Sequence, residues 1–216
     1  MAIRRNLFRI YWKIEKILVP KLRFSQTVYE DVLRSSVNAN TRWLDLGCGH
    51  EILPAWRLEE EKGLAESCQL IVGIDYELQA LKKHHGISHR VRGGITNLPF
   101  RDNSFNLLTA NMVVEHLDNP SEQFREVNRV LVPEGLFIFH TPNAHGYGTL
   151  MARMVPKILK SKLIYALDGR KEEDVFDTHY KANTVKDIEK LAQATGFEII
   201  NMKMLVTNAL FAVIPR

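Results

Sequence analysis

Between Arg42 and Thr141 the chain alternates short apolar runs with helical segments, and this rhythm restricts the fold more than any other feature. Runs typical of strands lie at 42–46, 70–74, 90–92, 105–110 and 135–141. Helical patterns lie at 26–37, 54–67, 78–84 and 120–131. Strands that alternate with helices pair in parallel through crossovers, and the helices then cover both faces of the sheet. The sequence therefore predicts an α/β fold.

The C-terminal third departs from this rhythm and then resumes it. We expect residues 143–183, which hold no clear alternation, to form an insertion beside the substrate. Thr184 suits the cap of a helix that stops at Gly196. Two more strands are expected at 197–202 and 205–213, and they would complete a seven-stranded mixed sheet.

Residues 1–38 form an N-terminal arm of different character, ahead of a domain at 39–216. Within residues 1–23, seven basic side chains and one acid give a net charge of +6. The net charge of the whole chain is +4, so the remaining residues contribute −2. Apolar residues recur at helical spacing at Ile3, Leu7, Ile10, Ile14 and Ile17. Such a basic amphipathic helix either packs across the domain or lies on an anionic membrane. A stretch at 157–167 repeats this character.

Composition excludes several classes of protein. The two cysteines, Cys48 and Cys68, have neither metal-ligand nor disulfide-framework spacing, so we expect no metal site and a reducing, cytoplasmic location. No apolar run approaches the ~18 residues of a membrane span, so any membrane contact is expected to be peripheral, at the inner surface. Because only the arm has a net positive charge, no nucleic-acid partner is expected.

The most informative stretch is Trp43–Glu51, which reads Trp-Leu-Asp-Leu-Gly-Cys-Gly-His-Glu. Gly47 and Gly49 let the backbone approach a ligand, and free N–H groups at a helix start hold an anion such as a carboxylate. Asp45 supplies an acceptor for a cationic amine. Asp75 ends the next strand, where a carboxylate accepts hydrogen bonds from two ribose hydroxyls. Together these features are typical of a nucleoside-binding site.

Two details argue against a nicotinamide dinucleotide as the ligand. A dinucleotide fingerprint has a third glycine at position 52, where this chain has Ile52. In addition, Asp45 stands directly before the glycine pair and would repel a pyrophosphate. The turn sequence therefore gives hydride chemistry poor support.

Several further motifs follow in order along the chain. They are Asp45–Gly49, Gly73–Asp75, Asn97–Asn106, Val114–Leu117, Arg129–Gly135 and Thr141–Asn143. This series closely resembles class I S-adenosylmethionine (AdoMet)-dependent methyltransferases of the type 11 group. The resemblance covers residues 40–143 well and 184–200 more loosely, and it implies a Rossmann-like sheet with AdoMet as co-substrate.

The same resemblance implies which residues surround AdoMet. They are Asp45, Gly47, Cys48 and Gly49 at the methionine end, Asp75 at the ribose, Tyr76, Gly94 and Ile95 at the adenine, and Asn111 near the sulfonium and the acceptor. Glu51 stands where the family usually has a third glycine, and Gly94 replaces an acid that meets the adenine amino group. These departures leave open a non-catalytic AdoMet- or nucleotide-binding or interaction protein on the same fold.

The expected reaction moves a methyl group to a small-molecule or a lipid- or glycan-linked acceptor, with O-methylation preferred. An oxygen acceptor needs a general base as well as alignment. Glu115 and His116 follow the fourth strand, and His179 lies in the insertion, so these three are the candidate catalytic residues. A structural role stays open for each. His140 and His145 are further candidates for the base, and for His140, which lies between apolar strand neighbours, a structural role is favoured over a catalytic one. Neither the acceptor nor the oligomeric state can be read from the sequence.

Overall fold

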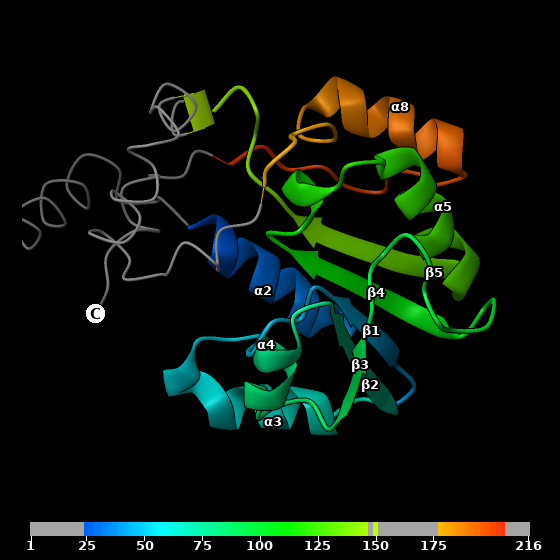
Figure 1. Ribbon diagram of the computed structural model, residues 1–216. Helices are drawn as coiled ribbons and strands as arrows, with labels where there is room; N and C mark the ends of the chain where they lie inside the picture. The colour runs from blue at the N-terminus through cyan, green and yellow to red at the C-terminus, as the bar shows by residue number, and fades with distance from the viewer. Residues whose placement is uncertain (1–23, 147–148, 151–176, 206–216) are drawn as a thin grey trace, which may run out of the picture.

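The computed structural model describes residues 24–146, 149–150 and 177–205, which form a parallel sheet between two layers of helices (Figure 1). The strands are β1 (Arg42–Leu46), β2 (Leu70–Asp75), β3 (His89–Arg92), β4 (Phe105–Asn111) and β5 (Leu131–His140). Their order across the sheet is β3-β2-β1-β4-β5, and every neighbouring pair is parallel. The predicted α/β class and the five strands between residues 42 and 141 are confirmed.

Helices cover both faces of the sheet, as the alternation predicts. One layer holds α2 (Ser25–Ser36), α3 (Leu58–Glu66), introduced by the short helix η1 (Ala55–Arg57), and α4 (Leu78–Lys83). The other holds α5 (Pro120–Val130) and α8 (Val185–Thr195), which pack against each other (Figure 1). A short helix η2 (Val114–His116) follows β4. The carboxyl ends of all five strands thus point to one edge, where ligands bind in such sheets.

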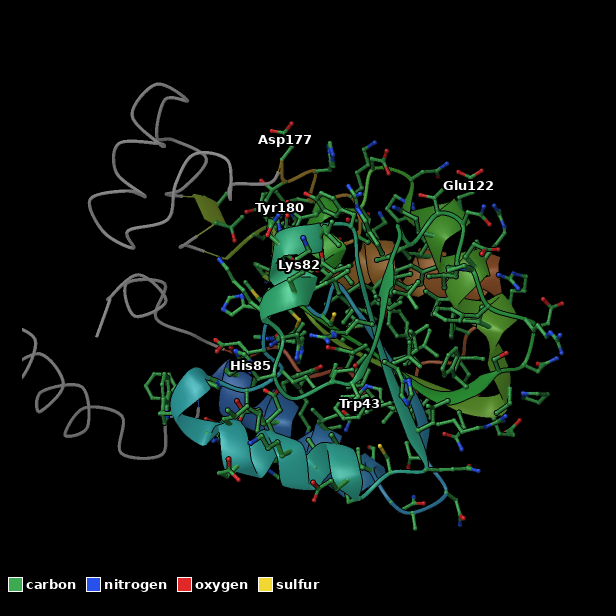
Figure 2. All side chains as sticks on the ribbon, turned by 60° about the horizontal axis from the view of Figure 1, so that its bottom comes forward. Trp43, Lys82, His85, Glu122, Asp177 and Tyr180 are labelled. Carbon is green, nitrogen blue, oxygen red and sulfur yellow. The ribbon has the colours of Figure 1, made fainter. Side chains whose placement is uncertain are left out.

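The central strand β1 shows how the sheet separates two apolar cores. Trp43 is fully buried toward Leu33 of α2, and Figure 2 shows it in the interior. Its neighbours Leu44 and Leu46 point to the opposite face and join the cluster that includes Phe124 of α5. Successive strand residues alternate between faces, so a strand covered on both sides must be apolar throughout. Asp45 is the exception in β1, a buried residue with a polar side chain.

The last helix is bounded as its sequence predicts. The hydroxyl of Thr184 accepts the N–H of Asp187 at 3.1 Å, and Gly196 ends the helix with a φ of +78°. The strand predicted at 197–202 is wrong, because this segment pairs with no strand in the part of the chain that the structure describes. Its first amide, of Phe197, instead closes the helix by donating to the carbonyl of Ala192 at 2.9 Å.

Five strands, not the seven predicted, occur in the described part of the chain. The second C-terminal strand, predicted at 205–213, lies outside the described residues except for its first residue. The amphipathic stretches at 3–17 and 157–167 also lie outside them. No helix within 24–146, 149–150 and 177–205 is long and apolar enough to cross a membrane.

Helix α2 falls within the predicted N-terminal arm, yet it is part of the domain core. Tyr29 is 6 % exposed and Leu33 fully buried, and both belong to the cluster around Trp43. The helix also contacts β5. Consequently the N-terminal part of α2, from Ser25 to Tyr29, lies close to the strand ends where a ligand would bind.

Candidate active site

The turn after β1 has the shape that its glycines predict. Gly47 and Gly49 have φ values of +62° and +56°, a left-handed conformation that favours glycine. A Cβ on Gly47 would lie 2.6 Å from Val113 Cγ2, so this position is closed by packing. A Cβ on Gly49 would meet no atom within 4 Å. Gly49 therefore faces open space in which a ligand can approach the backbone.

Asp75 joins this turn to the end of β2. Its Oδ2 accepts the N–H of Gly49 at 2.9 Å, and its Oδ1 accepts the N–H of Glu77 at 2.8 Å. Each carboxylate oxygen keeps a further lone pair for a hydroxyl donor. Next to it, the Tyr76 side chain is 53 % exposed, and a Cβ on Gly94 would meet nothing within 4 Å. A carboxylate, an aromatic ring and an open glycine thus lie on one side of the turn.

Asp45 occupies the layer beneath the turn. It is only 5 % exposed, and its Oδ1 accepts the hydroxyl of Thr109 at 2.5 Å. That hydroxyl in turn accepts the indole N–H of Trp43 at 2.6 Å. Burial raises the pKa of the Asp45 carboxyl to about 7, against the opposing effect of the Thr109 hydrogen bond. Asp45 is therefore bonded to the sheet interior, and its predicted contact with a ligand amine stays a prediction.

Cys48 contributes through its backbone and its bulk. Its N–H donates to the carbonyl of Ile74 at 3.1 Å, and its Sγ packs where a Cβ on Gly73 would come within 2.7 Å of it. The side chain is 3 % exposed, and burial raises the pKa of the thiol. A buried, protonated thiol is inert as a nucleophile, so Cys48 holds the turn against β2.

A second set of polar groups lies where β4 and β5 end. Asn111 Oδ1 lies 2.9 Å from His140 Nδ1, and Asn111 Nδ2 donates to Gln26 Oε1 at 3.1 Å. The His140 ring stacks on Tyr29 with centroids 5.8 Å apart. A groove in the described structure runs past this set; its lining includes Phe24, Gln26, Met112, His140, Thr141 and Asn143. Polar side chains from α2, β4 and β5 therefore meet at the same edge as the glycine turn.

Known proteins resemble this chain in sequence and in fold. Residues 44–139, which span β1 to β5, match the family described as a methyltransferase domain. These residues form a class I methyltransferase domain. AdoMet is the co-substrate of this family.

Curated relatives carry several acceptor specificities. A demethylmenaquinone methyltransferase of Staphylococcus haemolyticus is 29% identical over 108 residues, 47% of this chain and 44% of the relative. A malonyl-[acyl-carrier protein] O-methyltransferase of Coxiella burnetii is 33% identical over 72 residues, 33% of this chain and 25% of the relative. The chain thus spans less than half the length of these relatives.

Solved structures show the same fold. A SAM-dependent methyltransferase of Thermotoga maritima, described as a possible histamine N-methyltransferase, has a TM-score of 0.58. It is 14% identical, and the alignment covers 89% of this chain and 78% of that protein. At this identity the likeness concerns the fold alone, and it supports the Rossmann-like class I architecture.

The residues of the methyltransferase domain fit AdoMet chemically. The open side of Gly49 admits a ligand to the backbone, the free lone pairs of Asp75 suit two ribose hydroxyls, and the exposed ring of Tyr76 offers a surface for a base. Ile95 is partly buried and packs against the core beside Gly94. Glu51, which replaces a third glycine, is an exposed residue with His50 Nε2 3.9 Å from its carboxylate.

The three candidate catalytic residues, Glu115, His116 and His179, lie together where η2 contacts residues 177–183, the segment that returns to the sheet. Glu115 is 3 % exposed, and its Oε2 accepts the hydroxyl of Thr141 at 2.9 Å. Its carbonyl accepts the N–H of His179 at 2.8 Å, and His116 Nδ1 lies 2.8 Å from the carbonyl of Asp177. Figure 2 shows Asp177 at the periphery of the fold. These contacts give the three residues a structural use, and their catalytic role stays a prediction.

Two further details complete the junction. Asn183 Nδ2 donates to Thr141 Oγ1 at 2.6 Å and to the carbonyl of Pro142 at 2.9 Å, which ties the returning chain to the end of β5. Burial raises the pKa of the Glu115 carboxyl. No group of three His, Cys, Asp or Glu residues within the described ranges is arranged to hold a metal.

The sequence does not indicate Gln26 and Tyr29 as members of this polar cluster, and it favours a structural role of His140 over a catalytic one. Gln26 and Asn111 are 85 positions apart, and Asn111 and His140 are 29 apart. No local motif marks such contacts, because α2 reaches the strand ends only through tertiary packing. The one available signal was the position of His140 at the carboxyl end of a strand.

Proposed function

We propose that the protein transfers the AdoMet methyl group to a small-molecule or lipid-linked acceptor, with oxygen as the preferred acceptor atom. The observation that carries this proposal is the Gly49–Asp75 hydrogen bond of 2.9 Å, which joins an open glycine turn to the carboxylate that we expect to bind the ribose. The polar ends of β4 and β5 stand at the same edge of the sheet. Binding and acceptor groups are thus adjacent.

AdoMet, when bound, supplies a methyl group on an already activated sulfonium. The protein then has to align the two reactants and exclude water. Gly49 provides access to the backbone, and Asp75 fixes the orientation of the nucleoside through its remaining lone pairs. Asn111 and Met112 stand at the end of β4, next to the groove in which an acceptor would lie.

Three observations support a lipid-linked acceptor. The groove offers apolar side chains beside its polar ones: Met112 is 45 % and Trp56 61 % exposed, and both line it. The relative from Staphylococcus haemolyticus is named for demethylmenaquinone, an apolar quinone. The basic arm at residues 1–23 would bring the protein to the anionic membrane surface that holds such acceptors. Flotation with anionic liposomes tests that part, and a protein that stays in solution contradicts it.

Calorimetry with AdoMet and S-adenosylhomocysteine tests whether the protein binds the co-substrate and its product. Both ligands are expected to bind, and the absence of binding by either contradicts the enzyme function. Methyl-labelled AdoMet and a cell extract divided into lipid and aqueous fractions then locate the acceptor. Label in the lipid fraction supports a lipid-linked acceptor, and label in the aqueous fraction supports a small molecule. Binding without label in any fraction favours the non-catalytic alternative.

A further inference from the structure

A continuous line of hydrogen bonds runs from β5 to α2. It begins at His140 Nδ1, which lies 2.9 Å from Asn111 Oδ1. Asn111 Nδ2 donates to Gln26 Oε1 at 3.1 Å, and Gln26 Nε2 donates to Glu30 Oε1 at 3.1 Å. Four side chains from three elements thus form one line that ends on a carboxylate.

The carboxylate at its end fixes the direction of every bond in the line. Glu30 is 3 % exposed, and its Oε2 accepts from Arg57 Nη1 at 2.6 Å and from Arg34 Nη2 at 3.1 Å. A carboxylate held by two guanidinium groups is an acceptor only. Gln26 must therefore present its NH₂ group to Glu30, since the reversed amide would set two oxygens 3.1 Å apart.

The same reasoning passes along the line to the histidine. Because the NH₂ group of Gln26 donates to Glu30, the Gln26 oxygen faces Asn111. Asn111 must therefore donate its own NH₂ group to that oxygen. Asn111 then offers only an oxygen to His140. An oxygen acceptor requires a proton on Nδ1. A neutral imidazole protonated on Nδ1 carries its lone pair on Nε2.

The surroundings of the ring keep it neutral. Burial lowers the pKa of His140 below its ordinary value. On the α2 side the ring meets the phenol of Tyr29, whose own pKa is raised by burial and by the charge of Asp45. From β4 it meets the uncharged amide of Asn111. The amides of Asn111 and Gln26 lie between Glu30 and the ring, and the charge of Glu30 is balanced by ion pairs with Arg57 and Arg34.

We propose that His140 is the general base of the reaction, with Asn111 and Gln26 as positioning residues. This inference rests on the proposed function. The acceptor O–H bond breaks, its proton goes to His140 Nε2, and its electron pair stays on the oxygen. That oxygen receives the methyl group, while the electron pair of the broken sulfur–carbon bond stays on sulfur. The acceptor class that needs such a base is a hydroxyl, phenol or hydroquinone, not an already nucleophilic carbon.

The tautomer is tested without an acceptor. The full-length protein is labelled with ¹⁵N-histidine, and the ring signals are assigned by their loss in His140→Gln. The expected result is a neutral ring protonated on Nδ1 at pH 7, with an apparent pKa below 6.5. In Gln26→Leu, which breaks the line, the ring is expected to lose its single-tautomer signature. A ring protonated on Nε2, or one already cationic at pH 7, overturns the proposal.

Turnover separates this inference from the proposed function. In His140→Ala, S-adenosylhomocysteine affinity by calorimetry is expected to stay within about threefold, while label transfer to the accepting extract fraction falls by about 100-fold or more. Asn111→Asp keeps an acceptor for Nδ1 and adds a charge, so the acidic limb of the pH–rate profile moves up by about one pH unit. His89→Ala, an exposed residue at the opposite edge of the sheet, is the matched control. If neither ligand binds the wild-type protein, the proposed function fails. If ligand binds and label is transferred with the same pH profile in His140→Ala, the general base is wrong.

Discussion

The backbone N–H of Gly49 donates to Asp75 Oδ2 across 2.9 Å, so one carboxylate connects two loops that follow different strands. The same side chain accepts the N–H of Glu77 through its other oxygen. Asp75 therefore shapes the turn, and we expect its remaining lone pairs to accept hydrogen bonds from a ligand. The two uses are separable by experiment, because the first affects folding and the second affects binding.

Asp75→Ala is expected to weaken AdoMet binding by about 100-fold or more. The reason is the loss of hydrogen bonds from ribose hydroxyls to a charged acceptor, which contribute about 1.5–3 kcal/mol each. Calorimetry measures the affinity, and thermal unfolding reports any loss of the turn. Glu122→Ala is the control, since Glu122 is exposed on α5 (Figure 2). Equal affinities for Asp75→Ala and the control would remove Asp75 from the binding site.

Gly94→Asp is expected to tighten AdoMet binding by about fivefold to tenfold. The position is open, since a Cβ there meets nothing within 4 Å, and the family usually has an acid that meets the adenine amino group. A charge-assisted hydrogen bond of about 1 kcal/mol or more gives this gain. Gly94→Asn, which adds an uncharged acceptor of the same shape, should gain less. An unchanged affinity for Gly94→Asp would mean that the adenine lies elsewhere.

The turn and the position of Asp75 beside it were predictable because their signals are local. Gly47 and Gly49 adopt left-handed conformations that few other residues tolerate, and Asp75 stands at a strand end that its apolar run defines. The burial of Asp45 was not predictable. It depends on Thr109, 64 positions away, which turns the carboxylate toward the sheet.

Long-range pairing explains the remaining differences. The segment 197–202 has the composition of a strand, but a strand also needs an edge to pair with, and Phe197 is committed to closing α8. Glu115 follows β4 as a general base would, yet its side chain is buried and its carbonyl accepts the N–H groups of His179 and Tyr180. Strand formation at 197–202 depends on a partner edge, and the surroundings of Glu115 depend on a segment far along the chain, so no window of a few residues contains that information.

Glu134→Gly is expected to stabilise the protein by about 1 kcal/mol. Glu134 lies within β5 with a φ of +62°, a conformation that costs a residue with a side chain about 1–2 kcal/mol. Glycine adopts it without this cost, although its greater freedom in the unfolded chain offsets part of the gain. Urea unfolding at pH 7 measures the difference. Glu134→Ala keeps the Cβ and should give no such gain; a similar gain from both substitutions would assign the effect to the lost charge.

Asp45 gives the fold a pH dependence whose sign follows from its burial. The folded-state pKa of this carboxyl is about 7, against 3.8 for the free side chain. Below the lower value the group is protonated in both states and costs nothing. As pH rises toward 7 the unfolded chain ionises first, so the folded state loses stability relative to it. The full difference corresponds to about 4 kcal/mol above pH 7.

Asp45→Asn removes this dependence, because an amide of the same shape has no proton to lose. Urea unfolding from pH 4 to pH 8 is expected to show similar stabilities at the acidic end and a growing advantage of the variant, up to about 4 kcal/mol at pH 8. His84, whose pKa burial lowers to about 4, titrates in the opposite sense but is common to both proteins and cancels in the difference. A constant difference between Asp45→Asn and the wild type would mean that Asp45 is ionised in the folded protein throughout this range, held by a cation such as the ligand amine that its sequence position predicts.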